Sequence, residues 1–255
     1  MLKAIFFDVD GTLAETEEFH RRAFNSAFAQ ASIDAHWSVE EYRELLKVTG
    51  GKERLRAYFR ARDLAISEHD LQGLHRSKNE HYARNLRGGS AQLRPGVLRL
   101  MQQASQTGLM LGIATTTSLV NVDELLRHAI GPDWRQAFSC LVAGDQVAKK
   151  KPAPDVYQRC LELLRIAPEQ AVALEDSPAG VASARDAGIK VLVTPSVYTE
   201  GQDFSRADAL VPSLGDPGAP WEREQPGFVR RWVELQDLAR LVEPREIVPG
   251  TEMAQ

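Results

Sequence analysis

The stretch Phe6–Thr16, FFDVDGTLAET, ends an apolar run with two carboxylates and follows them directly with Gly-Thr-Leu. The run Leu2–Phe7 is typical of a buried strand in a parallel sheet. Alternate residues of a strand share a side, so Asp8 and Asp10 should project together from its carboxyl end, where ligands bind in open α/β sheets. Two close carboxylates repel unless a proton or a cation such as Mg²⁺ lies between them. Taken alone, the same letters fit an Asx turn equally well.

Further apolar runs alternate with helical patterns along the chain. Strands are predicted at 109–115, 171–174, 189–194 and 209–211, and helices at 94–107, 119–130, 155–165 and 178–187. Strands that alternate with helices predict parallel β-α units. The sequence therefore predicts an α/β fold with a Rossmann-like, doubly wound parallel sheet.

The stretch 15–89 interrupts this alternation. It contains no convincing strand, and it has amphipathic helical periodicity over 17–31, 39–47, 53–62 and 68–85. We therefore predict a core built from 1–14 and 90–214, with a helical cap domain at 15–89. Residues 215–255 form a C-terminal extension with an irregular Pro- and Gly-rich part, a helix over 228–242 and a frayed tail from 243.

Bulk composition narrows the classes of partner. The 255 residues carry a net charge of −4. This charge argues mildly against a protein whose whole surface binds nucleic acid or an anionic membrane. A negatively charged ligand would need a local cluster of basic residues. The two cysteines, Cys140 and Cys160, lack metal-ligand or redox spacing, and the N-terminus does not read as a signal peptide. We expect a cytoplasmic, monomeric protein whose partner is a small molecule.

Three more polar motifs lie at strand ends or just before a helix. They are Thr115 in GIAT, Lys151 in KPAPD and Glu175-Asp176 in ALEDSP. Each has a plain alternative, because Thr115 could begin a helix and Lys151 belongs to a run of three lysines. Asp176 could merely complement the dipole of the helix that Ser177-Pro178 begins. The plain alternatives would require three motifs to occur by coincidence in the same chain as the Asp8 motif. The functional interpretation is therefore preferred.

In this order, the four motifs resemble those of the haloacid-dehalogenase-like phosphotransferases. The resemblance implies that Asp8 attacks phosphorus to form an aspartyl phosphate, while Asp10 serves as acid and base. It implies that Thr115 and Lys151 bind phosphoryl oxygens. It also implies a Mg²⁺ ion, with ligands from Asp8, the backbone carbonyl of Asp10, and Asp176, and with Glu175 close by.

The cap contains a second segment of interest, Thr49–Arg54 (TGGKER). It fails the P-loop pattern, but two glycines before Lys52 and Arg54 suit a helix start that receives an anion. A plain turn with surface basic residues is the alternative. The full set of predicted substrate-binding residues is Glu17, His20, Arg43, Gly50, Gly51, Lys52, Glu53, Arg54, Lys78, Thr115, Thr116, Thr117 and Ser118. His20 by itself would more often be an ordinary surface histidine.

The position of the insert resembles the helical-cap branch that contains β-phosphoglucomutase and phosphoglycolate phosphatase. Within it, the strings around Asp10, Thr49 and Ala114 are most similar to a bacterial group linked to the Calvin cycle. That resemblance implies a sugar-phosphate phosphatase acting on xylulose-1,5-bisphosphate, an inhibitor of Rubisco, to give xylulose 5-phosphate. A phosphosugar mutase and a non-catalytic sugar-phosphate-binding regulator remain alternatives, because they would share nearly all of these residues.

Overall fold

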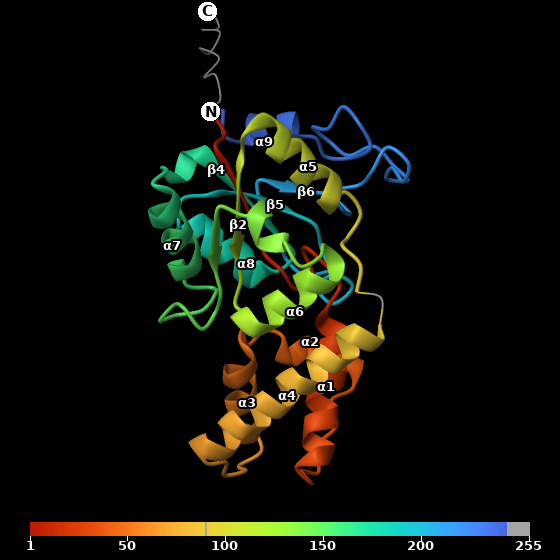
Figure 1. Cartoon of the computed structure of the whole chain (residues 1–255), viewed down its shortest axis with the longest axis vertical. Helices are drawn as coiled ribbons and strands as arrows, with labels where there is room; N and C mark the ends of the chain where they lie inside the picture. The colour runs from red at the N-terminus through yellow and green to blue at the C-terminus, as the bar shows by residue number, and fades with distance from the viewer. Residues whose placement is uncertain (90, 244–255) are drawn as a thin grey trace, which may run out of the picture.

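The computed structural model of the protein describes residues 1–89 and 91–243. Parallel strands form one sheet in the order β3-β2-β1-β4-β5-β6 (Figure 1). Their bounds are β1 Ala4–Phe7, β2 Met110–Ala114, β3 Cys140–Val142, β4 Ala171–Glu175, β5 Lys190–Val193 and β6 Ala209–Leu210. The chain crosses over β1 between β3 and β4. The carboxyl ends of β1, β2 and β4 therefore meet at a topological switch point, where ligands bind in this fold class.

Both faces of the sheet are buried by helices, as the predicted doubly wound fold requires. The core helices are α5 Val97–Thr107, α6 Leu119–Ala129, α7 Asp155–Leu164 and α8 Pro178–Asp186. Side chains of a strand alternate between faces. Ile5 and Phe7 pack in one cluster with residues of α5 and α6, whereas Ala4 and Phe6 pack in another with residues of α7 and α8. The continuous apolar run of β1 follows from this burial on two sides.

Four helices lie between β1 and α5, and we call them the cap. They are α1 Glu17–Gln30, α2 Val39–Leu45, α3 Gly51–Arg60 and α4 Glu68–Gly88. Their apolar faces enclose a separate aromatic cluster that includes Phe24, Phe28 and Trp37. The two connections to the core lie side by side, since Ala14 and Leu93 form an antiparallel bridge. In Figure 1 the cap occupies one end of the molecule, below the sheet.

The segment after β6 packs against α5 at the end of the molecule away from the cap (Figure 1). The predicted helix over 228–242 is wrong in its first half, because α9 spans only Leu235–Leu241. Before it, the amide of Val233 donates to the carbonyl of Leu214 at 2.8 Å, a long-range bond that replaces the helical pattern. The amide of Glu234 is bonded to the Asp237 carboxylate at 2.7 Å, which starts the helix. Most of the predicted tail, from residue 244, lies outside the described residues.

The predicted elements otherwise match the observed ones to within a few residues. Strand β3 is the exception that the sequence did not reveal, because only three apolar residues form it. It pairs with β2 at the sheet edge, with Gly112 opposite Cys140. A Cβ atom on Gly112 would lie 2.7 Å from the Cys140 Sγ, so this approach needs glycine. Within the two described stretches, no helix is both long and apolar enough to cross a membrane.

Candidate active site

The Asp8 carboxylate lies just past β1 and is held by Lys151. The amide of Asp8 donates to the carbonyl of Leu174 at 3.0 Å, which continues the pairing of β1 with β4. The Lys151 Nζ lies 2.6 Å from Asp8 Oδ1, 2.8 Å from the Ala114 carbonyl and 2.7 Å from Glu175 Oε1. All three ammonium protons thus have protein acceptors. Burial raises the pKa of Asp8 to about 7, although Lys151 opposes the rise.

Three carboxylates gather beside this lysine. Asp8, Glu175 and Asp176 each place an oxygen within 4.8 Å of the others. Burial and then the charge of Asp8 raise the pKa of Asp176 well above its usual range. Glu175 Oε2 is buried and has no hydrogen-bond partner among the residues described. A single ammonium does not balance three carboxylates, and the all-oxygen donor set fits a hard divalent cation.

Asp10 points away from this cluster and toward the cap. Its Oδ1 accepts a bond from Thr16 Oγ1 at 2.5 Å and lies 3.0 Å from His20 Nε2. Lys78 Nζ lies 2.6 Å from His20 Nδ1, and the His20 ring stacks on Tyr82 with 4.0 Å between centroids. Burial would raise the pKa of Asp10, but His20 and Thr16 outweigh it and hold the pKa at about 2.

The surroundings of His20 favour the neutral form of its ring. Burial, followed by the charge of Lys78, lowers the pKa of His20. A neutral ring has one donor and one acceptor nitrogen. The Asp10 carboxylate can only accept, so the Nε2–H donates to it and Nδ1 accepts from the Lys78 amine. Two side chains of the cap, Lys78 and His20, are thus hydrogen-bonded in sequence to the Asp10 carboxylate of the core.

A cleft of about 1640 Å³ lies between the core and the cap, which is ample for a small ligand and water. The core wall carries the segment after β2, where the Thr115 Oγ1 accepts from the Thr117 amide at 3.2 Å. The predicted residues that line the cleft are Asp8, Asp10, Asp176, Lys151, Thr115, Thr116, Thr117, Ser118, Glu17, His20, Gly50, Gly51, Lys52, Glu53, Arg54 and Lys78. Glu175 lies behind this wall, fully buried, where Tyr157 and Lys151 bind it.

The cap wall is built around the start of α3. Gly50 has a positive φ of 87°, which favours glycine. A Cβ on Gly51 would lie 2.7 Å from His75 Nε2, so a larger residue would be crowded there. Arg54 is buried and donates to the Tyr42 hydroxyl at 3.1 Å. That hydroxyl donates in turn to Glu17 at 2.8 Å. Arg54 and Glu17, which both line the cleft, are thus linked through the Tyr42 hydroxyl.

Arg43 is the predicted substrate residue that the structure places elsewhere. It is not among the residues lining the cleft. Its guanidinium donates to the Val197 carbonyl at 3.2 Å and lies over the Tyr198 ring. The preceding residue, Tyr42, is fully buried in the cap. Neighbouring positions of a helix point about 100° apart, so Arg43 is turned away from the direction that Tyr42 takes.

Direct bonds join the cap to the core around the cleft. Lys150 Nζ lies 2.8 Å from Glu53 Oε2, and Thr49 Oγ1 donates to the Lys151 carbonyl. On another side, the Asn121 amide donates to Asn79 Oδ1 at 3.2 Å. These contacts hold the cap against the core.

Several of these residues were missed by sequence reasoning. Lys150 looked like part of a solvated lysine run, and Asn79 and Asn121 belong to no motif. His75 lies one turn before Lys78 on α4, a helical spacing that could have indicated it. Tyr157, whose hydroxyl donates to Glu175 Oε1, resembles an ordinary core aromatic in sequence. Packing, rather than a sequence motif of their own, brings most of them to the site.

Comparison with known proteins agrees with this geometry. Residues 2–188 match the family described as haloacid dehalogenase-like hydrolase. The protein CbbY of Rhodobacter capsulatus is 49% identical over 213 residues, covering 84% of this chain and 94% of that protein. The plasmid-encoded CbbY of Cupriavidus necator is 44% identical over 243 residues, covering 93% and 95%.

A solved structure extends the likeness to three dimensions. It is a mutant of CbbY from Rhodobacter sphaeroides in complex with xylulose-(1,5)bisphosphate. The TM-score is 0.81 at 46% identity, and the match covers 86% of this chain and 98% of that one. The family match over residues 2–188 includes β1 to β4, the cap and the carboxylate cluster. This chain is a homologue of CbbY and belongs to the haloacid dehalogenase-like hydrolase family.

Proposed function

We propose that this protein is a Mg²⁺-dependent phosphatase that converts xylulose-1,5-bisphosphate into xylulose 5-phosphate and inorganic phosphate. The observation that carries the proposal is the chemical separation of two neighbouring aspartates. Asp8 faces Lys151 and the carboxylate cluster, whereas Asp10 faces Thr16 and His20. Different environments push the two carboxyl groups toward different roles, nucleophile and acid-base. The bisphosphate is the ligand of the homologous CbbY structure.

The reaction has two steps. In the first, an Asp8 oxygen bonds to phosphorus, the bond from phosphorus to the sugar oxygen breaks, and Asp10 gives its proton to that oxygen. In the second, water bonds to phosphorus, Asp10 takes its proton, and the bond to Asp8 breaks. Thr115 and Lys151 would hold the phosphoryl oxygens, with Lys151 exchanging one of its three protein acceptors for a phosphoryl oxygen. Asp8, the Asp10 carbonyl and Asp176, with Glu175 close by, would hold Mg²⁺, which supplies positive charge for the transferring group.

Asp10 needs a proton for the first step and must lack one for the second. With a pKa of about 2 in the substrate-free protein, it is a carboxylate, the form that the second step uses. A phosphate dianion beside it would raise its pKa, since like charges disfavour ionisation. Binding of the substrate therefore favours the protonated form that the first step needs.

The second phosphate of the substrate would bind at the cap. Lys52 and Arg54 line the cleft next to the start of α3, where free backbone amides and basic side chains suit an anion. Lys150 reaches the same region from the core through its ion pair with Glu53. Residues 15–89 would then act as the cap domain that closes over the sugar, while 1–14 and 90–214 form the catalytic core and 215–255 an extension.

The test is release of inorganic phosphate from a panel of sugar bisphosphates and monophosphates, with and without Mg²⁺. We expect the highest kcat/KM with xylulose-1,5-bisphosphate and none with Asp8→Asn. Interconversion of hexose phosphate isomers without phosphate release would indicate a mutase instead. Binding of the bisphosphate without turnover of any compound would indicate a regulator. Either result would reject the phosphatase proposal.

A further inference from the structure

The loop that follows β5 sends side chains into both the core site and the cap. Tyr198 belongs to this loop, yet its ring is buried in the aromatic cluster of the cap and is only 6% exposed. The next residue, Thr199, reaches in the other direction and lies 3.3 Å from Asp176 Oδ2 through its Oγ1. Two consecutive residues of the core thus contact the cap and the carboxylate cluster.

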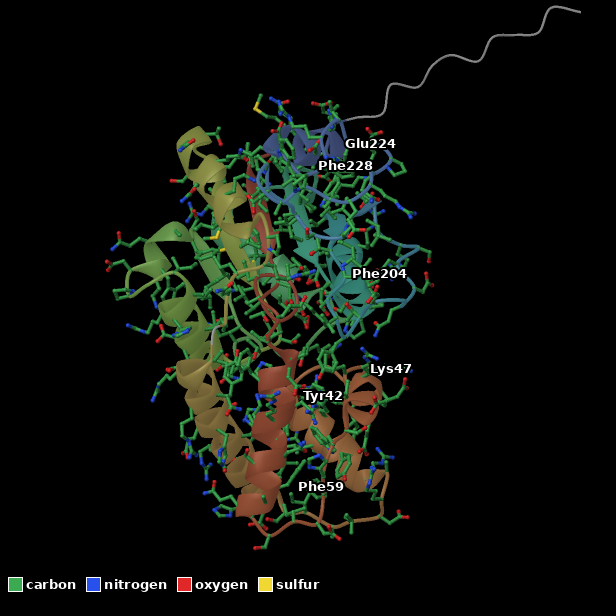
Figure 2. All side chains as sticks on the ribbon, turned by 90° about the vertical axis from the view of Figure 1, so that its right-hand side faces the viewer. Tyr42, Lys47, Phe59, Phe204, Glu224 and Phe228 are labelled. Atoms are coloured by element: carbon green, nitrogen blue, oxygen red, sulfur yellow. The ribbon has the colours of Figure 1, made fainter. Side chains whose placement is uncertain are left out.

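The cap end of this connection is well defined. The Tyr198 hydroxyl donates to Glu18 Oε2 at 2.6 Å. Its ring meets the Tyr42 ring edge-on, with 5.7 Å between centroids and an interplanar angle of 88°. Arg43 covers the ring and bonds the preceding carbonyl, that of Val197. Figure 2 shows Tyr42 in the half of the cap nearer the core, with Phe59 farther away. Tyr198 therefore contacts the cap residue that also bonds Glu17 and Arg54 in the cleft.

The core end is a tight turn. Thr199 Oγ1 accepts a bond from the Ser196 amide at 2.9 Å and lies 3.0 Å from Ser196 Oγ. The amide of Thr199 donates to the Ser196 carbonyl at 3.1 Å. The Arg94 guanidinium holds the start of the loop through the carbonyls of Thr194 and Pro195, at 2.8 and 2.6 Å. Because these bonds make the turn stiff, a shift of Tyr198 must also move Thr199.

Asp176 has little room to adapt to such a shift. A Cβ on Gly11 would lie 2.2 Å from Asp176 Oδ2, so the nucleophile loop packs directly on this oxygen. Arg94 also donates to the Gly11 carbonyl. The same arginine thus holds the two backbone segments that flank the Asp176 carboxylate. The orientation of this oxygen depends on both segments keeping their places.

We propose that Tyr198 is a positioning residue that couples docking of the cap to the orientation of the Asp176 carboxylate, through Thr199. The inference rests on the proposed function, because it takes Asp176 as a ligand of Mg²⁺. Groups that orient a metal ligand typically change metal affinity by about 10–100-fold when they are removed. Coupling is reciprocal, so Mg²⁺ would also favour the docked cap. A cap that closes on substrate would then complete the metal site in the same movement.

The experiment measures binding of Mg²⁺ alone to the full chain by isothermal titration calorimetry, together with the Tm shift that Mg²⁺ causes. Tyr198→Ala should raise the Mg²⁺ Kd about tenfold. The matched control is Tyr58→Ala. Tyr58 is also buried in the aromatic cluster of the cap, where it stacks on Phe28 and meets Trp37 edge-on. It does not belong to the loop after β5. The control should lower Tm but leave the Mg²⁺ Kd unchanged. Thr199→Val should raise the Kd with a smaller loss of Tm.

An unchanged Mg²⁺ Kd in Tyr198→Ala, or an equal rise in Tyr58→Ala, would overturn the coupling. If Tyr198→Ala does not fold, Tyr198→Leu, which retains apolar volume, replaces it under the same criteria. Wild-type protein that shows no Mg²⁺ binding would overturn the metal site of the proposed function as well. Wild-type binding that the variants retain would overturn the coupling alone. The two failures are therefore distinguishable without any substrate.

Discussion

His20 Nε2 lies 3.0 Å from Asp10 Oδ1, so a side chain of the cap holds the core carboxylate that we propose as acid and base. Lys78, on a different cap helix, fixes the ring from its other nitrogen. The alignment of Asp10 therefore depends on where the cap lies. An open cap would leave Asp10 without this partner, which would favour reaction with a bound substrate over reaction without one.

Replacing His20 should lower the rate of the chemical step. In His20→Ala, Asp10 loses the donor that aligns it, and we expect kcat to fall about 10²-fold, at the lower end of the usual contribution of acid-base groups. KM should change much less, because the ring contacts Asp10 and Lys78. The measurement is steady-state phosphate release. His81→Ala is the control, because His81 bonds Gln30 away from the cleft and should retain wild-type kcat.

Stability should depend on pH through Lys78. Burial lowers the pKa of Lys78 from 10.5 to about 7, with Arg54 adding to the effect. Between about pH 7 and pH 10.5, Lys78 is therefore protonated in the unfolded chain but not in the folded protein. The free energy of unfolding consequently rises with pH across this window. The gain is at most about 1.4 kcal/mol per pH unit.

Urea denaturation at several pH values tests this dependence. Lys78→Met should flatten the slope between about pH 7 and 9. The exposed Lys47, paired with Glu44 on the surface, provides the control Lys47→Met, which should keep the wild-type slope. A slope that survives Lys78→Met unaltered would contradict the assignment.

The cap residue Lys52 should matter more for bisphosphates than for simple phosphate esters. Lys52→Ala removes a positive charge from the cleft wall, where the second phosphate is proposed to bind. We expect kcat/KM for xylulose-1,5-bisphosphate to fall about 10–100-fold, a loss of about 1.4–2.8 kcal/mol, with little change for an aryl phosphate. Arg60→Ala, at the exposed end of the same helix, should change neither. Equal losses on both substrates would show that Lys52 is structural.

Lys151 should stabilise the fold as well as bind phosphate. Lys151→Met leaves Asp8 and Glu175 buried without their shared cation, and the loss of one partner from a buried pair typically costs about 3–5 kcal/mol. The free energy of unfolding should fall by this order in EDTA, and Mg²⁺ should restore part of it. Denaturation curves with EDTA and with Mg²⁺ measure both effects. The exposed neighbour provides the control Lys149→Met, which should match wild type.

Local sequence determined the architecture of the core and which polar residues gather at the edge of its sheet. The apolar run before Asp8 has no polar side to expose, so it forms a strand buried on both faces. Parallel strands bring their carboxyl ends to one edge, which is why the prediction that Asp8, Thr115 and Glu175-Asp176 meet there follows from their places in the chain. Strand β3 was not predicted because three residues are too few to show a periodic pattern. The helix expected over 228–234 is absent from the structure, where long-range backbone hydrogen bonds take its place.

Only the tertiary structure decided how the cap serves the site. Arg43 follows Tyr42 by one residue, and which of them packs inside the cap depends on how α2 rotates against its neighbours. Packing also brings partners to the carboxylates of the site. Asp10 is bonded by His20, which Lys78 holds in turn. Glu175 is bonded by Tyr157, and Asp176 by Thr199. Sequence spacing reports local periodicity alone. Contacts between elements depend on packing, whose free energy is shared among many side chains at once.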